Sequence, residues 1–223
     1  MADVTLTYKG STIAEMNNSG TKTLKTSGKY CEGDIGVSYV KPSSGGSGEL
    51  ALKMITGKGT ITELPSDITT IRNGAFYNCT NITLTSLPSG ITSIGDYAFY
   101  NCKNLALTSM PSVSLIGEFS FWYCSSLNIN TISASNIGRS AFAYCYGLTE
   151  ITINGKTTIN NFAFDRCGNL TKVTFNNSNV MMGNSVFSNC TNLTDIYVPW
   201  AEGAVLGAPW GATNATIHYN TTT

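Results

Sequence analysis

The chain has 223 residues, of which 13 are basic and 13 acidic, so its formal net charge is zero, and charged residues make up only 12% of it. Proteins that bind nucleic acid need clustered basic residues to neutralise phosphates, so this composition argues against nucleic-acid binding. No apolar run reaches the ~20 residues that a membrane-spanning helix needs, so membrane insertion is not expected. The first residues, Met1 to Leu6, lack the basic start and apolar stretch of a secretory signal, and we expect none.

Residues 1–41 predict a small N-terminal β module. Val4–Tyr8 and Asp34–Val40 alternate apolar and polar side chains, and glycine-containing turn signals lie between them. Residues 42–49 are rich in Gly and Ser and predict a flexible linker. A module of about 40 residues is hard to stabilise alone. We therefore expect it to attach the chain to a partner or to form an oligomer.

A repeated unit occupies residues 50–198 and begins with a degenerate first coil. Its six copies follow the pattern Ile-Gly-x-x-Ala-Phe-x-x-Cys-x-x-Leu, and the cysteines recur every 21 to 23 residues, at Cys79, Cys102, Cys124, Cys145, Cys167 and Cys190. A repeat of this length indicates a solenoid of stacked coils. Alternating stretches between the copies, such as Ile151 to Ile153, predict one short strand per coil, with Thr152, Thr174 and Tyr197 pointing outward on a shared face.

The stretch from Gly to Cys in each copy is too short for a long helix and predicts one or two helical turns. The predicted fold class is therefore an α/β solenoid, with one short strand and one short helical turn per coil, preceded by the β module. Residues 199–223 depart from the repeat, and we expect them to form a C-terminal cap in which Trp200 or Trp210 covers the open end of the core.

The repeated cysteines are expected to be reduced, buried thiols that pack as small apolar side chains. Disulfides between neighbouring coils are the alternative. There is no Cys-x-x-Cys pair, and the single His218 lies near the C-terminus, so a zinc site is not expected. Cys31 lies outside the series and is predicted on a strand.

The repeated unit resembles the BspA-like, or Treponema-type, leucine-rich repeats over roughly residues 60–198. Departures from the pattern include Ser120 and Val186 in place of Ala, Asn160 in place of Gly, and Met182 in place of Ile. The resemblance implies a leucine-rich repeat fold. Members of that family are mostly surface proteins of bacteria and protists, implicated in adhesion to host proteins and other cells, and are not known as enzymes.

The N-terminal stretch Gly20 to Val37 is similar to short β modules in tail-associated proteins of phages that infect Gram-positive gut bacteria. This resemblance implies a virion protein that is assembled in the host cytoplasm and attached to other tail proteins through residues 1–41. The absence of a secretory signal would fit such a protein.

No catalytic activity and no cofactor are expected, because the single His, the scattered acids and the core cysteines leave no plausible nucleophile and base. A binding surface is predicted instead. When coils stack in register, aromatic side chains that follow the repeated Phe should form a ladder suited to sugar rings. The candidate ligand-binding residues are Tyr77, Tyr100, Trp122, Tyr123, Tyr144 and Tyr146.

Two other interpretations remain open. In the first, the aromatic side chains only fill the coil edge, with Tyr hydroxyls in water. Alternatively, the ligand would bind the strand face, although stacked Thr and Asn are also usual on a solvated sheet. The residues predicted to line that face are Glu150, Thr152, Asn154, Lys172, Thr174, Asn176, Asp195 and Tyr197.

We predict a non-enzymatic, virion tail-associated adhesin of a phage that recognises a bacterial host surface, glycan or protein, through the solenoid. One alternative is a BspA-like adhesin on a bacterial cell surface that binds host proteins or other cells. The other is a structural spacer in a tail. The expected partners are the host-surface glycan or protein, other tail proteins through residues 1–41, and a second copy of the chain.

Overall fold

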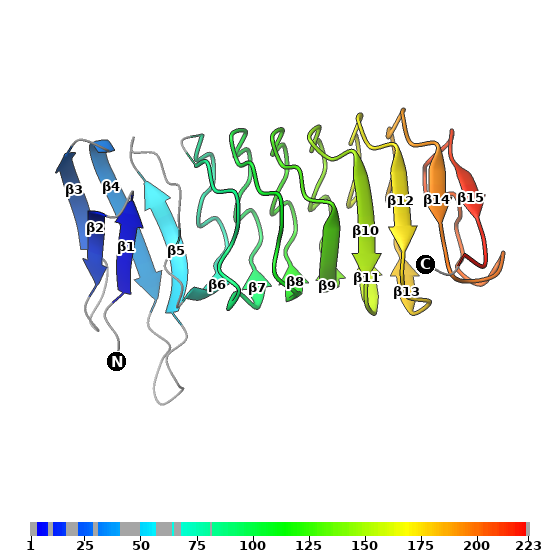
Figure 1. Ribbon diagram of the computed structural model, residues 1–223, viewed down its shortest axis with the longest axis horizontal. Coiled ribbons are helices and arrows are strands. Elements are labelled where there is room, and N and C mark those ends of the chain that lie inside the picture. The colour runs from blue at the N-terminus through cyan, green and yellow to red at the C-terminus, as the bar shows by residue number, and fades with distance from the viewer. Residues whose placement is uncertain are drawn as a thin grey trace.

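In the computed structural model the chain forms an elongated stack of coils, with the N-terminal strands at one end (Figure 1). The structure describes residues 4–8, 11–16, 22–28, 31–40, 50–56, 64, 68–80 and 82–221, and it describes side chains for residue 64, residues 68–80 and residues 82–221. The predicted leucine-rich repeat solenoid is confirmed. Among these residues there is no helix long and apolar enough to cross a membrane.

The N-terminal strands pair antiparallel. β1 (Val4–Tyr8) pairs with β2 (Ser11–Met16), β3 (Lys22–Gly28) pairs with β4 (Cys31–Val40), and β4 pairs with β5 (Leu50–Thr56). β5 then pairs parallel with β6 (Ile68–Ile71), the first strand of the solenoid. The sheet therefore runs from β3 into the coils, although residues 42–49, the predicted linker, lie outside the described residues.

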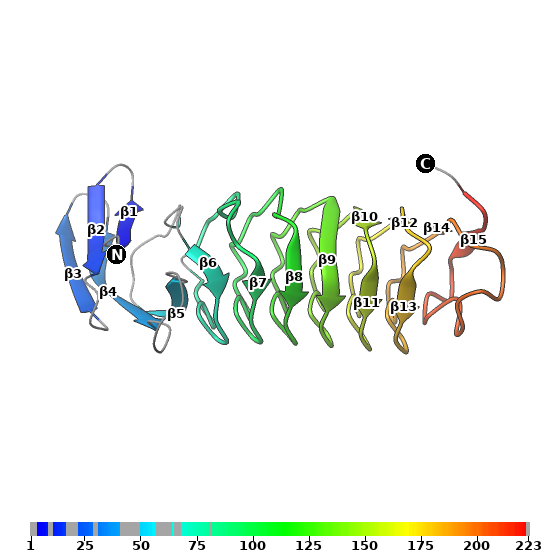
Figure 2. The ribbon, with the colours of Figure 1, turned by 90° about the horizontal axis from the view of Figure 1, so that it is seen from below.

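Each coil contributes to one or both of two rows of parallel strands, which Figure 2 shows side by side along the solenoid. The first row contains β6, β7 (Ser93–Ile94), β8 (Val113–Ile116), β9 (Thr131–Ile137), β11 (Thr157–Ile159) and β13 (Val180–Met182). The second row contains β9, β10 (Glu150–Asn154), β12 (Lys172–Phe175), β14 (Asp195–Tyr197) and β15 (Thr216–His218).

The strands pair in register, so equivalent residues of successive coils stack. Ile151 and Ile153 are buried, whereas Thr152 between them points away from the core. Thr152 lies opposite Thr174, and Thr174 lies opposite Tyr197. The outward face that the sequence predicted for these three residues is therefore confirmed, although Thr174 is almost fully covered by its neighbours.

The short helical turn predicted in each coil is not formed, and a series of tight turns takes its place. In the first copy the Cys79 amide donates to the carbonyl oxygen of Phe76 at 3.0 Å, whereas the Phe76 amide donates to Ala98 in the next coil at 2.7 Å. Alternate amides thus bond within the turn and between coils. Two residues in each copy also have positive φ, such as Tyr97 at 55° and Asn101 at 57°, whereas a helical residue has φ near −63°. The described residues contain no helix.

The repeated Phe side chains form a continuous stack through the core, from Phe76 to Phe187. Neighbouring ring centroids are 4.9 to 5.6 Å apart, and the six rings are fully buried. The six repeat cysteines lie beside them as buried free thiols, not disulfides, as the sequence predicted.

The C-terminal segment covers the end of this core. Trp200 and Trp210 are both buried, and Trp200 packs on Phe175 with 5.3 Å between ring centroids. The Trp210 indole donates to the carbonyl oxygen of Leu206 at 2.9 Å, and its own carbonyl accepts the Phe187 amide at 2.9 Å. Both tryptophans therefore close the core, whereas the sequence predicted that one of the two would do so.

Candidate functional site

The candidate aromatic residues all lie on the turn side of the coils. Adjacent turns are joined in register by backbone bonds, such as that from the Asn78 amide to the Tyr100 carbonyl at 2.8 Å. Equivalent side chains in successive coils are therefore separated by about 5 Å, the spacing of paired strands. Aromatic rings at this spacing are in contact with one another.

The first three rings form the predicted ladder. The Tyr77 and Tyr100 centroids are 4.8 Å apart, those of Tyr100 and Trp122 are 4.6 Å apart, and the planes differ by 6° or less. Offset stacking of this kind is favourable, but it largely covers the facing ring surfaces. A ligand therefore meets mainly ring edges along this part, so these three rings also act as packing.

Beyond Trp122 the rings tilt. The Tyr144 plane lies at 59° to Trp122 and at 72° to Tyr123, and Tyr146 lies at 80° to Tyr123 and at 85° to Tyr144. The ring centroids of these pairs are 5.1 to 6.4 Å apart. Edge-to-face contacts cover less of each ring face than stacking does. Tyr123, Tyr144 and Tyr146 therefore offer faces as well as edges to a ligand.

Two further rings complete the surface, and sequence reasoning missed both. Tyr97 and Phe119 stack with centroids 5.1 Å apart, and Tyr97 also contacts Tyr100 at 5.8 Å. A signal was present, because Tyr97, Phe119 and Phe162 occupy the same position of the repeat, two residues before the buried Phe. We call the following eight residues the aromatic patch: Tyr77, Tyr97, Tyr100, Phe119, Trp122, Tyr123, Tyr144 and Tyr146.

Two Tyr hydroxyls of the patch, those of Tyr100 and Tyr146, have a raised pKa. Burial raises the pKa of Tyr100, and the neighbouring Tyr77 and Tyr97 raise it further. Burial also raises the pKa of Tyr146, with smaller contributions from Tyr123 and Tyr144. Both hydroxyls therefore stay protonated at neutral pH and can donate hydrogen bonds to a ligand.

Two cations lie over rings of the patch. Lys103 Nζ is 4.9 Å from the Tyr123 ring centroid, and Arg166 Cζ is 5.4 Å from the Tyr144 ring centroid. Both distances are within the range of cation–π attraction. Arg166 also forms an ion pair with Asp165, with 3.5 Å between Nε and Oδ2.

On the strand face, the alternative site, charged side chains pair with each other. Lys172 Nζ lies 3.1 Å from Glu150 Oε2, and His218 Nε2 lies 2.7 Å from Asp195 Oδ1. Hydrogen bonds from His218 and Thr194 lower the pKa of Asp195. A small cavity of about 200 Å³ lies on this face and is lined by Asn130, Thr131, Glu150, Ile151, Thr152, Lys172 and Thr174. The charged residues of this cavity, Glu150 and Lys172, already form an ion pair with each other, so fewer charged groups remain for a ligand.

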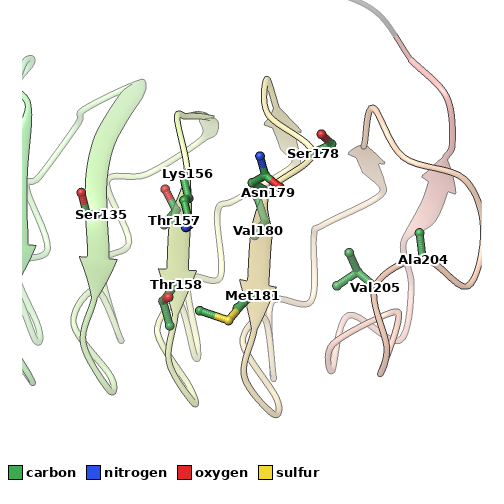
Figure 3. A pocket seen from close by; sticks show the side chains of 10 residues that line it. All are labelled: Ser135, Lys156, Thr157, Thr158, Ser178, Asn179, Val180, Met181, Ala204 and Val205. Atoms are coloured by element: carbon green, nitrogen blue, oxygen red, sulfur yellow. The ribbon is translucent and has the colours of Figure 1, made fainter.

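A larger cavity of about 540 Å³ lies outside the first strand row, beside the C-terminal segment (Figure 3). Sequence reasoning had no signal for it, because Ala204 and Val205 come from the segment after the repeats. The Thr157 hydroxyl in its wall is not free, since it donates to the carbonyl oxygen of Ala134 at 2.6 Å. The cavity is lined by Ser135, Lys156, Thr157, Thr158, Ser178, Asn179, Val180, Met181, Ala204 and Val205.

The described residues contain no group of three or more His, Cys, Asp or Glu side chains that could hold a metal ion. Cys79 and Cys124 are poor nucleophiles, because burial raises the pKa of their thiols, to about 11 for Cys79 and further for Cys124. The arrangement that the structure does provide is a surface of aromatic rings and flanking cations, which suits binding.

The repeats match a known family of repeat proteins. A family model described as BspA type leucine rich repeat region (6 copies) matches residues 56–158 and 128–202. Among curated proteins, none matches the chain. A solved leucine rich repeat protein of T. pallidum is 23% identical, and the match covers 89% of this chain and 83% of that one with a TM-score of 0.49.

A second solved structure, a leucine rich cell surface protein from Faecalibacterium prausnitzii A2-165, is 21% identical with a TM-score of 0.51. The match covers 72% of this chain and 52% of that protein, so the chain spans about half of its length. At this identity the likeness concerns the fold alone.

Proposed function

The chain belongs to the BspA-type leucine-rich repeat family, and we propose that it is a non-enzymatic binding protein that recognises a glycan of a bacterial host surface through the aromatic patch. The observation that carries this proposal is the gathering of eight contacting rings on one side of the coils. Tyr77, Tyr97 and Tyr146 are exposed and the other five rings are half-buried, and contiguous apolar surface open to solvent often marks an interaction site.

The chemistry of the patch favours a glycan. A sugar ring has an apolar face that packs on an aromatic ring and hydroxyls that bond to polar neighbours. Tyr provides both properties, an apolar ring and a polar hydroxyl. Asn78 and Asn101 border the stacked rings and share one hydrogen bond at 2.8 Å. An amide side chain can form several hydrogen bonds, so both can also bond to sugar hydroxyls. Repeat solenoids commonly bind through one extended face.

Two biological settings fit this function. The N-terminal resemblance, over residues 20–37, supports a phage tail protein attached through residues 1–41. The description of the F. prausnitzii protein as a cell surface protein supports the other setting, an adhesin on a bacterial cell. Neighbouring genes separate the two: tail and lysis genes support the virion, whereas a sortase or secretion locus supports the cell surface.

The test is a binding assay with purified cell-wall polysaccharide of candidate host bacteria. The triple variant Tyr100→Ala, Trp122→Ala and Tyr144→Ala should bind at least about tenfold more weakly, since each aromatic contact contributes roughly 0.5–1.5 kcal/mol. The matched control is Tyr197→Ala, which removes a ring from the strand face and should leave binding unchanged. Circular dichroism and thermal melts would confirm that both variants fold.

Three outcomes decide between the alternatives. Unchanged binding by the folded triple variant overturns the role of the patch. Loss of binding in Tyr197→Ala alone assigns the strand face instead. Binding to cells that survives removal of their polysaccharide identifies a protein partner, and the absence of any binding favours the structural spacer.

A further inference from the structure

We infer that the glycan bound by the aromatic patch is anionic, and that Lys103 and Arg166 recognise its negative charge. This inference rests on the proposed function and names its ligand class. It depends on where these two cations lie relative to the tilted rings of the patch.

The two cations approach the same pair of rings from opposite directions along the solenoid. Lys103 belongs to the second copy of the repeat and reaches over Tyr123 in the third. Arg166 belongs to the fifth copy and reaches back over Tyr144 in the fourth. The Tyr123 and Tyr144 centroids are only 5.9 Å apart. The two positive charges therefore bracket one small aromatic surface, so a ligand lying on that surface contacts both.

The positive charge at this surface is only partly neutralised. Among the described residues, Lys103 has no carboxylate within ion-pair distance. Arg166 contacts Asp165 through Nε at 3.5 Å, and the other oxygen of Asp165 accepts a hydrogen bond from Asn189 at 2.9 Å. The Arg166 side chain is 53% exposed. Its terminal N–H groups can therefore bind a carboxylate or phosphate, for which the guanidinium geometry is well suited.

The same geometry excludes a cationic ligand. Faces of Tyr and Trp attract ammonium groups, including quaternary ammonium, within about 6 Å of the ring centroid. Here one face of Tyr123 and one face of Tyr144 already carry the chain's own cations. A third positive charge would be repelled by both. Sugars that carry an anion satisfy the rings and the cations together.

Two kinds of bacterial glycan carry such a charge, and they share the recognised chemistry. Uronic-acid polymers carry carboxylates, and sugar-phosphate polymers carry phosphates. Probes of both kinds therefore belong in one experiment, with a neutral probe of the same backbone as the reference.

The experiment measures binding of the whole chain to oligogalacturonate, to its fully methyl-esterified neutral form, and to a sugar-phosphate polymer. We expect at least one anionic probe to bind about tenfold or more tightly than the ester at low salt, and this advantage should shrink as NaCl is raised. The double variant Lys103→Gln, Arg166→Gln should lose the preference and retain the affinity for the ester. The matched control Lys156→Gln removes an exposed lysine near the 540 Å³ cavity and should bind like the parent.

The outcomes separate this inference from the function on which it rests. Equal binding of the ester and both anionic probes overturns the inference and leaves glycan binding intact. A preference that survives in the double variant, or that is lost equally in Lys156→Gln, also overturns it. If the parent chain binds none of these probes and no host polysaccharide, the proposed function fails and the inference fails with it.

Discussion

The thiol of Cys145 donates a hydrogen bond to the carbonyl oxygen of Phe121 in the preceding coil, with 3.0 Å between the two atoms. The same carbonyl accepts the amide of Cys124 at 3.1 Å. A carbonyl oxygen has two acceptor sites, and a buried one left unpaired is unfavourable. The thiol thus fills a small core space and satisfies a backbone group. This explains why Cys, and not a purely apolar residue, recurs at this position.

The bond repeats along the whole solenoid. It joins the thiol of each cysteine from the second copy onward to the Phe carbonyl one coil earlier, at 2.9 to 3.1 Å. The repeated Phe and Cys are therefore linked through the backbone as well as by packing. Residues with this structural role cannot also contact a ligand, so binding is left to the outward positions.

Alkaline pH should destabilise the protein. Burial raises the pKa of Cys79 from 9.0 to about 11 and raises the pKa values of Cys102, Cys124, Cys145 and Cys167 further. Because the pKa is raised in the folded state, the free energy of unfolding has its full value below about pH 9. It falls as the pH rises further, because the thiols of the unfolded chain ionise first. Each of these five thiols should contribute a loss of about 1.4 kcal/mol per pH unit in that window.

Urea unfolding at a series of pH values from 8 to about 10.5 would measure this loss, since the range spans the ordinary thiol pKa. In the variant Cys79→Ala the free energy of unfolding should fall less steeply with pH, and the difference should equal the contribution of one thiol. A free energy of unfolding that does not change over this range would contradict the burial of the thiols.

The middle of the Phe stack should be essential for stability. Phe142 is fully buried, and its ring lies 5.2 Å from both Phe121 and Phe164. Phe142→Ala should lower the free energy of unfolding by about 3–5 kcal/mol, because it leaves a cavity in a packed core. Chemical denaturation measures the change. The control is Phe162→Ala, since Phe162 is 37% exposed and should cost less; an equal denaturation midpoint for Phe142→Ala and the parent would refute the core assignment.

Close approach of the coils should make Gly138 hard to replace. A Cβ added at Gly138 would lie 2.5 Å from the carbonyl carbon of Gly117 in the preceding coil. Backbone atoms of a paired coil cannot move aside easily, so Gly138→Ala should destabilise the protein by about 1–3 kcal/mol or more. At Gly168 the nearest atoms, from Tyr146, are 3.8 Å away. Gly168→Ala should therefore change the thermal midpoint little, and equal effects of the two substitutions would contradict the predicted contact.

Part of the candidate site was predictable from the repeat alone. Tyr77, Tyr100 and Trp122 occupy one repeat position, and register between coils is enough to predict that they stack. The tilt of Tyr144 and Tyr146 was not predictable, because ring orientation depends on side-chain packing among several coils. The same is true of Lys103 and Arg166, which reach their rings from the second and fifth copies of the repeat.

The sequence by itself determined the solenoid, the buried Phe and Cys series and the closing tryptophans, because apolar residues at a constant spacing have to be buried coil by coil. Only the tertiary structure decided the conformation of the turns. Amides such as that of Phe76 bond to the next coil and not along their own segment, so local preference for a helix was overridden. Those turns in turn set where the rings and cations of the aromatic patch point.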